Sequence, residues 1–299
     1  MPRLQELRNA ARARLREAAI SQPEASADLL LARALGRDLA WLYAHPEAEI
    51  PPEAGRLVDG WLEQRAQGTP AQYLTGVQEF FGREFAVTSA VLIPRPETEL
   101  VVEAALELAL TMPSPQIVDV GTGSGCIAIT LALELVQRRH PARLWGVDLS
   151  ESALRVAERN AARLQAEVAW LHGDLMAPWL AAEAQRRHSL PRQLDLIVSN
   201  PPYIAESELE SLPPEVQKYE PRSALIAGPS GTEIYARLLP QAFHLLRPGG
   251  GLVLELGYNT AGQLLPALRD WELVEIKNDL QGLPRVLRAR RPGHAGGLG

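Results

Sequence analysis

The first 70 residues carry apolar side chains at the spacing of amphipathic helices. An apolar residue recurs every three or four positions between 4 and 15, and the same spacing returns at 29–34 and at 58–62. Residue types typical of helix ends and helix starts occur at Gly36, Gly68 and Pro51-Pro52. The pattern therefore predicts a small group of short helices at the start of the chain.

After residue 115 the pattern changes to apolar strands separated by helical segments. Five strands are expected at 116–120, 144–148, 168–172, 194–199 and 251–256. Strands that alternate with helices are typical of an α/β domain with a mainly parallel sheet. Two more strand-like segments, 272–277 and 285–289, are close enough along the chain to pair antiparallel at the end of that sheet.

Three connecting segments are less regular. Two aromatic-rich runs flank Gly82 within 77–87, which indicates a hairpin or an extended connector between domains. A helix is expected to follow Pro96. The connection at 176–193, rich in Ala, Gln and Arg, is compatible with either helix or loop.

Composition and charge limit the class of protein. The 299 residues are 46% hydrophobic and 22% charged, which is enough apolar material for a core and excludes a disordered or collagen-like chain. A single cysteine, Cys126, excludes an internal disulfide, and the six histidines are scattered, so neither secretion nor a metal site is expected. A cytoplasmic location fits best.

The chain also lacks the patterns of membrane and nucleic-acid proteins. Its first ten residues are charged where a signal peptide is apolar, and no run of about 18 apolar residues occurs, so no membrane contact is expected. The formal net charge of −6 argues against broad attraction to phosphate backbones. Direct sequence-specific nucleic-acid binding is therefore not expected.

A glycine-rich turn follows the first predicted strand and opens a helix. The turn consists of Gly121, Thr122, Gly123, Ser124 and Gly125. Glycines let a ligand approach the backbone, and the amides of a helix N-terminus point at it, so the turn predicts a nucleotide-like cofactor. A tight turn without a ligand is the alternative. A dinucleotide fingerprint would need glycine where this chain has Cys126, so NAD is disfavoured.

Two aspartates at strand ends indicate the kind of cofactor. Asp119 begins the pattern D-x-G-x-G-x-G, and Asp148 closes the second predicted strand. Together they resemble the arrangement in S-adenosylmethionine-dependent methyltransferases, which implies that Asp148 accepts hydrogen bonds from the two ribose hydroxyls. Alternatively, Asp148 caps the following helix, a position for which Ser150 competes.

The fourth predicted strand ends in Asn200-Pro201-Pro202-Tyr203. Proline lacks an N–H and favours extended geometry before it, so this stiff turn presents carbonyl groups and the Asn200 side chain. Accepting both hydrogens of an NH2 group, at the Asn200 oxygen and the Pro201 carbonyl, directs the nitrogen lone pair toward a methyl donor. Tyr203 would pack against the flat group. A purely structural turn is the alternative, but both motifs follow strand ends, where ligands of α/β sheets bind.

Five segments carry a closer resemblance. They are PAQYLTGVQEFFG (70–82), LIPRPETE (92–99), VDVGTGSG (118–125), VSNPPYI (198–204) and YEPRSAL (219–225). In this order and spacing they resemble the release-factor glutamine N5-methyltransferase family, over most of the chain. The resemblance implies an enzyme of translation termination that methylates the glutamine of the Gly-Gly-Gln motif in peptide chain release factors, with S-adenosylmethionine as cofactor.

The resemblance also implies a domain organisation. A helical substrate-binding domain is expected at 1–75, a β-hairpin linker at 76–95, the methyltransferase domain at 96–290 and a flexible tail at 291–299. The methyltransferase domain would be Rossmann-like, with seven strands in a mainly parallel sheet whose last strand is antiparallel.

Site residues follow from the same resemblance. Cofactor contacts would fall on the glycine turn, Asp148, Asp174, the next residue and Asn200, and the NPPY turn would hold the glutamine. This chain has Leu175 where relatives have an aromatic residue, so Trp179 is a candidate for stacking on the adenine.

The LIPRPETE segment allows two interpretations. It either starts a helix, with Pro96 in the first turn, or directs Arg95 or Glu97 toward the cofactor.

Two other functions remain possible on the sequence alone. An adenine-N6 nucleic-acid methyltransferase shares the NPPY turn, but it would be expected to carry a basic stripe, which residues 1–90 lack. A non-catalytic protein that binds S-adenosylmethionine and a partner would have no need of the turn. Because the turn itself contains no group that titrates near neutrality, we expect catalysis by positioning and a methyl-transfer rate that is flat with pH.

Overall fold

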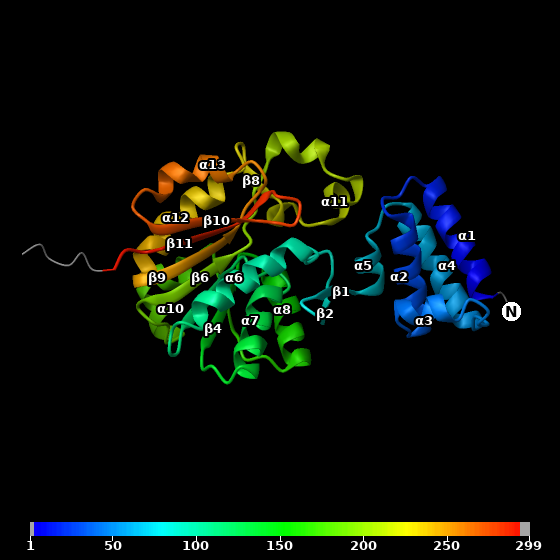
Figure 1. Cartoon of the computed structure of the whole chain (residues 1–299), viewed down its shortest axis with the longest axis horizontal. Coiled ribbons are helices and arrows are strands. Elements are labelled where there is room, and N and C mark those ends of the chain that lie inside the picture. Colours follow the sequence, from blue (N-terminus) through cyan, green and yellow to red (C-terminus); the bar gives the residue numbers. More distant parts are fainter. Residues whose placement is uncertain (1–2, 294–299) are drawn as a thin grey trace, which may run out of the picture. The chain divides into compact units, whose positions relative to one another are not determined.

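The computed structural model describes residues 3–293 and consists of two compact units (Figure 1). One unit contains the described residues up to Val77 together with Pro213–Tyr219. The other contains Gln78–Leu212 and the described residues from Glu220 onward. Most of the expected tail, 294–299, lies outside the described residues.

The first unit is helical. Its elements are α1 (Leu4–Glu17), α2 (Pro23–Leu35), α3 (Leu39–Ala44), α4 (Pro52–Ala66), α5 (Ala71–Thr75) and α11 (Pro214–Tyr219). The helix boundaries agree with the sequence signals, because α4 begins at Pro52 and Gly36 ends α2 with a φ of 60°. The apolar stripe that the sequence spacing predicts packs inward, with Leu4, Leu15 and Val58 fully buried.

Helix α11 comes from late in the sequence yet packs within the first unit. The Arg65 guanidinium is buried and pairs with the Glu215 carboxylate at 2.5 Å. The Ser21 hydroxyl also donates to Glu215, at 2.7 Å, and the Tyr219 hydroxyl donates to the Gln67 carbonyl at 3.2 Å. The chain therefore enters the helical unit twice, which no sequence pattern indicated.

The second unit contains a seven-stranded sheet in the order β10-β11-β9-β6-β3-β4-β5. Its strands are β3 (Gln116–Val120), β4 (Arg143–Asp148), β5 (Ala169–His172), β6 (Leu194–Ser199), β9 (Leu246–Glu255), β10 (Glu272–Asn278) and β11 (Pro284–Arg290). The five strands from β9 to β5 run parallel, whereas β11 pairs antiparallel with both β9 and β10. The predicted mainly parallel sheet with an antiparallel last strand is confirmed.

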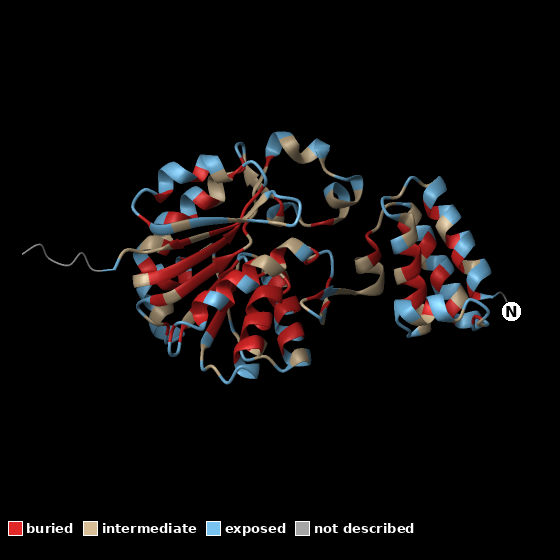
Figure 2. Ribbon diagram, in the orientation of Figure 1, coloured by how far each residue is buried: buried red, intermediate tan, exposed pale blue. Residues whose placement is uncertain are grey.

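Helices cover both faces of this sheet (Figures 1 and 2). They are α6 (Glu99–Ala109), α7 (Cys126–Gln137), α8 (Glu151–Leu164), α9 (Ala177–Leu180), α10 (Ala182–Arg187), α12 (Glu233–Leu245) and α13 (Ala261–Leu264). Ile117 packs with α6 and α7, while its neighbour Val118 packs with α12 on the opposite face. Because both faces are buried, the strands read as continuous apolar runs.

The structure shows what three connecting segments form. Strands β1 (Val77–Phe80) and β2 (Arg83–Ala86) form a hairpin, with positive φ at both Phe81 and Gly82. Pro96 opens a short 3-10 turn that leads into α6, as expected. The connection at 176–193 contains the short helices α9 and α10. Within residues 3–293, no helix is both long and apolar enough to span a membrane.

Candidate active site

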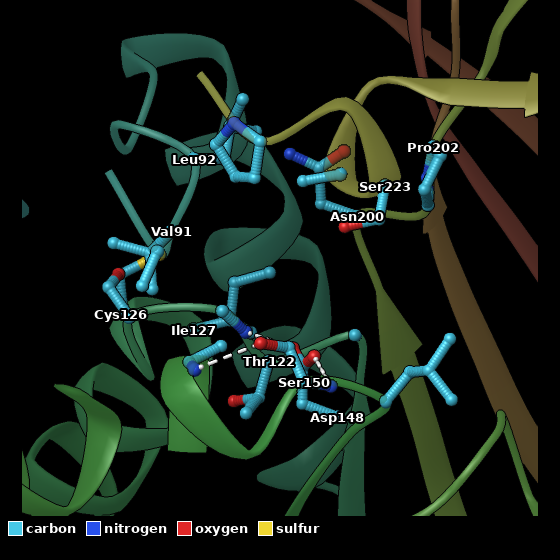
Figure 3. Close-up of a pocket in the computed structure, with 18 of the residues that line it drawn as sticks. Val91, Leu92, Thr122, Cys126, Ile127, Asp148, Ser150, Asn200, Pro202 and Ser223 are labelled. Atoms are coloured by element: carbon cyan, nitrogen blue, oxygen red, sulfur yellow. Dashed lines mark hydrogen bonds between the residues drawn. The ribbon is translucent and has the colours of Figure 1, made fainter. Parts of the chain in front are cut away.

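The segments that follow β3, β4, β5 and β6 meet at a cavity of about 390 Å3. This volume lies within the roughly 300–1,000 Å3 of typical small-molecule sites. In Figure 3, Asn200, Pro202 and Ser223 lie together in the upper right, with Thr122, Asp148 and Ser150 below them. The structure thus brings the two sequence motifs to one cavity, at the carboxyl edge of the sheet.

The glycine turn forms one wall of the cavity. Gly121, Gly123 and Gly125 have φ values of 72°, 56° and 81°, in the left-handed region that favours glycine. A Cβ atom on Gly125 would lie 2.8 Å from Ile129 Cδ1 and 3.0 Å from the Trp170 ring, so no larger residue fits there. Thr122 and Ser124 also line the cavity. The turn leaves its backbone open toward the space where a ligand can lie.

Asp148 lies at the end of β4 and lines the same cavity. Its carboxylate accepts hydrogen bonds from the Gly123 and Ser150 amides, both at 2.8 Å. The helix cap is Ser150, whose hydroxyl accepts from the Ala153 amide at 3.2 Å, so the interpretation of Asp148 as the cap is wrong. Burial raises the pKa of Asp148, while the two amides act in the opposite direction.

Asp119 is not brought to the cavity surface. It is 1% exposed, and it accepts hydrogen bonds from the Thr122 hydroxyl at 2.6 Å and the Ala128 amide at 3.3 Å. Burial raises the pKa of Asp119 to about 7. Its contacts hold the glycine turn from behind.

Cys126 does line the cavity, but burial raises the pKa of its thiol to about 12, so it is not a thiolate at neutral pH.

The segment after β5 contributes Asp174 and Leu175 to the cavity wall. Asp174 pairs with Arg237 of α12, which also lines the cavity. Trp179 is 1% exposed and packs edge-to-face on Trp145, with ring centroids 6.1 Å apart. The hypothesis that Trp179 stacks on the adenine is therefore wrong, because the short helix α9 turns this ring into the core instead of the cavity.

The NPPY turn leaves β6 and divides its residues between the cavity and the core. Asn200 and Pro202 line the cavity, whereas Pro201 is buried and Tyr203 packs against the apolar core. A Cβ atom on Gly257 would lie 2.8 Å from the Tyr203 ring, so this glycine makes room for the tyrosine.

A small two-stranded sheet holds the chain directly after the turn. Strand β7 (Ile204–Ala205) pairs in parallel with β8 (Ile226–Gly228), and the Ile204 amide donates to the Leu225 carbonyl at 3.0 Å. The turn is thus fixed at both ends, by β6 before it and by β7 after it.

The structure adds two polar residues that the sequence analysis missed. The Asn200 side-chain NH2 donates to the Thr98 hydroxyl at 3.1 Å, and this hydroxyl donates to the buried Glu255 carboxylate at 2.6 Å. The signal for Glu255 was an acid inside an otherwise apolar strand, which is unfavourable unless hydrogen bonds compensate. Arg95 lines the cavity and pairs with Glu220.

Comparisons with known proteins agree with this architecture. The class of protein that the sheet and the glycine turn define is the S-adenosylmethionine-dependent methyltransferases. The hMettl16 catalytic domain, solved with an RNA hairpin, superimposes with a TM-score of 0.54 at 17% identity, over 79% of this chain and 83% of that chain, which shows the shared fold. Family models match at 6–76 (PrmC N-terminal domain) and 98–212 (methyltransferase small domain).

Curated relatives identify the family. The release factor glutamine methyltransferase of Koribacter versatilis is 44% identical over 90% of this chain and 92% of its own length. The proteins of that name from Moorella thermoacetica and Deinococcus radiodurans are 44% and 36% identical, over 93% and 97% of this chain and 95% and 99% of their own lengths. The chain belongs to the release factor glutamine methyltransferase family.

Within the part of the chain that the structure describes, no group of three His, Cys, Asp or Glu side chains could hold a metal ion.

Proposed function

We propose that this protein transfers a methyl group from S-adenosylmethionine to the side-chain nitrogen of the glutamine in the Gly-Gly-Gln motif of peptide chain release factors. The observation that carries this function is the Asn200 side chain on the cavity wall, with its NH2 group engaged by Thr98 at 3.1 Å. Its oxygen is therefore available to accept a hydrogen bond from an amide. Release factors act on ribosomes, so the proposed location is the cytoplasm.

The residues that line the cavity are suited to bind S-adenosylmethionine. The left-handed glycine turn offers exposed backbone, and the Asp148 carboxylate, which lines the cavity, retains acceptor capacity beyond its contacts to backbone amides. Asp148 would accept the ribose hydroxyls, and Asp174, Leu175 and Asn200 would complete the cofactor contacts. When bound, S-adenosylmethionine supplies a methyl group made electrophilic by the sulfonium.

The residues of the turn orient the nucleophile. An amide nitrogen is a poor nucleophile because its lone pair is delocalised. Hydrogen bonds from the substrate NH2 to the Asn200 oxygen and the Pro201 carbonyl would direct the lone pair toward the methyl donor. Tyr203, whose ring packs against the core, would hold the turn beside the amide plane. The substrate nitrogen would take the methyl group and give up one of its protons to water, which keeps the amide product neutral. Catalysis on this account is positioning and stabilisation of moving charge.

A transfer assay with three acceptors tests the function. The protein is incubated with methyl-labelled S-adenosylmethionine and a release factor, the same factor with its Gly-Gly-Gln glutamine changed to alanine, or adenine-containing DNA. We expect label only on the unaltered factor. Label on DNA would support the adenine-N6 alternative, and cofactor binding without transfer to any acceptor would support a non-catalytic protein.

We infer that the helical unit, 1–75, selects the protein substrate, that 76–95 links it to the methyltransferase domain, and that this domain, 96–290, holds the cofactor. All cavity-lining residues belong to the second unit. Deletion of 1–70 should therefore retain S-adenosylmethionine binding and lower release-factor methylation by about an order of magnitude or more, because substrate positioning is lost. Calorimetry and the transfer assay measure the two effects.

The control addresses α11, which loses its partner Arg65 in the deletion. Glu215→Ala removes that ion pair, while the buried Arg65 guanidinium keeps its hydrogen bond to the Thr69 carbonyl at 3.2 Å. We expect the folded variant to methylate the factor within about threefold of the wild-type rate, because neither residue lines the cavity. An unchanged rate in the deletion variant, or an equal loss in Glu215→Ala, would contradict a substrate-selecting role for the helical unit.

A further inference from the structure

A carboxylate lies buried at the end of β9, within hydrogen-bonding distance of the segments that form the site. Glu255 is 1% exposed. The Thr98 hydroxyl donates to its Oε2 at 2.6 Å, and the Tyr203 hydroxyl donates to its Oε1 at 3.3 Å. Burying a charged carboxylate is unfavourable, and an apolar residue would suit the core of this strand better. Its presence therefore calls for a role beyond packing.

The Glu255 carboxylate determines which group donates and which accepts in the hydrogen bonds that Thr98 makes. An ionised carboxylate only accepts, so the single hydroxyl hydrogen of Thr98 is used by Glu255. The Thr98 oxygen can then only accept from Asn200, whose Nδ2 lies 3.1 Å away. The Asn200 amide must therefore turn its NH2 group to Thr98, which leaves its oxygen free on the cavity side.

We propose that Glu255, acting through Thr98, is a positioning residue that fixes the orientation of the Asn200 amide so that its oxygen, and not its nitrogen, faces the substrate amide. This inference rests on the proposed function. Because Thr98 donates to Glu255, it can only accept from Asn200. The Tyr203 hydroxyl, at the other end of the NPPY turn, donates to the same carboxylate.

The physical reason is that an asparagine amide is nearly symmetric in shape. Rotated by half a turn, Asn200 fills the same space but offers two donors where an acceptor is needed, so it opposes the substrate NH2 instead of orienting it. The reversed arrangement is excluded only if the series of hydrogen bonds from Asn200 through Thr98 ends at a group that carries no hydrogen, such as an ionised Glu255. A protonated Glu255 could donate to Thr98, which could then donate to the Asn200 oxygen and expose the NH2 group.

The surroundings of Glu255 bear on its protonation. Burial raises its pKa to about 7, Thr98, Arg285 and Tyr203 act to lower it, and Glu97 acts to raise it. Arg285, which pairs with Asp279 at 3.0 Å, acts through its charge from β11, and Glu97 acts from the turn before α6. The fixed orientation should therefore be lost as the pH falls through about 7. This titration replaces the flat pH profile expected from the turn alone.

The remaining titratable groups near Glu255 stay neutral in this range. The Tyr235 hydroxyl donates to the Glu255 backbone carbonyl at 2.7 Å, and burial raises the pKa of this tyrosine and of Tyr203 well above neutrality. The Cys126 thiol is likewise protonated. Asp119, whose pKa burial also raises to about 7, lies under the glycine turn, so the experiment must separate it from Glu255.

The test compares Glu255→Gln, Thr98→Val and Thr98→Ser in single-turnover methylation of a release factor between about pH 6 and 9, with both substrates saturating. Glu255→Gln and Thr98→Val should lower the rate about tenfold at saturating cofactor, because the orientation of the Asn200 amide is lost. Thr98→Ser keeps the hydroxyl and should recover most of the rate. The wild-type rate should fall below about pH 7, a dependence that Glu255→Gln removes.

A matched control is Thr130→Val in α7. Thr130 is fully buried and its hydroxyl has no hydrogen-bond partner in the described structure, so this variant reports the effect of the same substitution outside the hydrogen-bond chain. We expect its rate and pH profile to match the wild type. If Thr98→Val lowers thermal stability alone, with the wild-type rate and pH profile retained in the folded protein, Thr98 is structural and the proposal is overturned.

A second measurement does not depend on the substrate. In protein labelled with 15N at asparagine, the Asn200 side-chain NH2 signals, identified by their absence in Asn200→Ala, should titrate with a midpoint near pH 7 in the wild type and not in Glu255→Gln. The same titration in Glu255→Gln would assign it to another carboxyl group, such as Asp119, and overturn the proposal. A wild-type protein that shows the Asn200 titration but methylates no release factor would contradict the proposed function and leave the positioning role supported.

Discussion

Asn200→Ala is expected to lower the single-turnover rate of glutamine methylation by about 10²-fold or more, the scale seen when one preorganised polar group is removed. The variant deletes the acceptor oxygen on the cavity wall and leaves the Thr98 hydroxyl without the donor now 3.1 Å away. The substrate amide then loses the hydrogen bond that orients its lone pair. Rapid-quench methylation of a release factor, with both substrates saturating, measures this effect directly.

Asn200→Asp tests the acceptor oxygen of this side chain separately from its donor NH2 group. The carboxylate keeps an oxygen toward the cavity, but it cannot donate to Thr98 and it adds a charge near Glu255. We therefore expect a rate between those of the wild type and Asn200→Ala. The midpoint of thermal unfolding is the control for misfolding, and a rate for Asn200→Ala within about threefold of the wild type would remove the turn from the mechanism.

Asp148→Ala is expected to weaken S-adenosylmethionine binding by roughly 10- to 100-fold, which corresponds to about 1.5–3 kcal/mol for hydrogen bonds to a charged group. The ribose hydroxyls would lose their acceptor, and the Gly123 amide would lose the partner that holds the turn at 2.8 Å. Calorimetric titration gives the affinity. Thermal unfolding provides a second measure, since a ligand at a hundred times its Kd adds roughly 2.7 kcal/mol of stability.

Two controls accompany this measurement. Asp270→Ala removes an exposed aspartate that does not line the cavity, and its affinity should equal that of the wild type. NAD should give no thermal shift with either protein. A clear shift with NAD and none with S-adenosylmethionine would show that the glycine turn serves a different cofactor, whereas wild-type affinity in Asp148→Ala would show that the ribose is held elsewhere.

The sheet could be predicted because its strands are short apolar runs with both faces buried. Ile117 and Val118 face opposite helix layers, so each strand carries a strong signal that does not depend on distant partners. The glycine turn and the NPPY turn could be placed together for a related reason. Each follows a parallel strand, and the carboxyl ends of parallel strands share one edge of the sheet.

The directions of side chains outside these two turns could not be predicted from the sequence. Trp179 was a reasonable partner for the adenine by position, but the local path of α9 places it against Trp145 in the core. The return of Pro213–Tyr219 to the helical unit has no local signature, because its helix is short and its main partner, Arg65, is far away in the sequence. Contacts of this kind depend on the path of the whole chain.

The sequence by itself determined the layered α/β architecture, the helical first unit, the glycine turn and the NPPY turn, because local spacing and backbone-restricting residues encode these features. Only the tertiary structure decided that Ser150 and not Asp148 caps α8, that Asp119 supports the turn from behind, and that Thr98 and Glu255 stand behind Asn200. Thr98 and Glu255 are 157 positions apart in the sequence, so no local pattern could have paired them. A hydrogen bond of fixed direction exists only once folding has brought its donor and acceptor within 3 Å or so of each other.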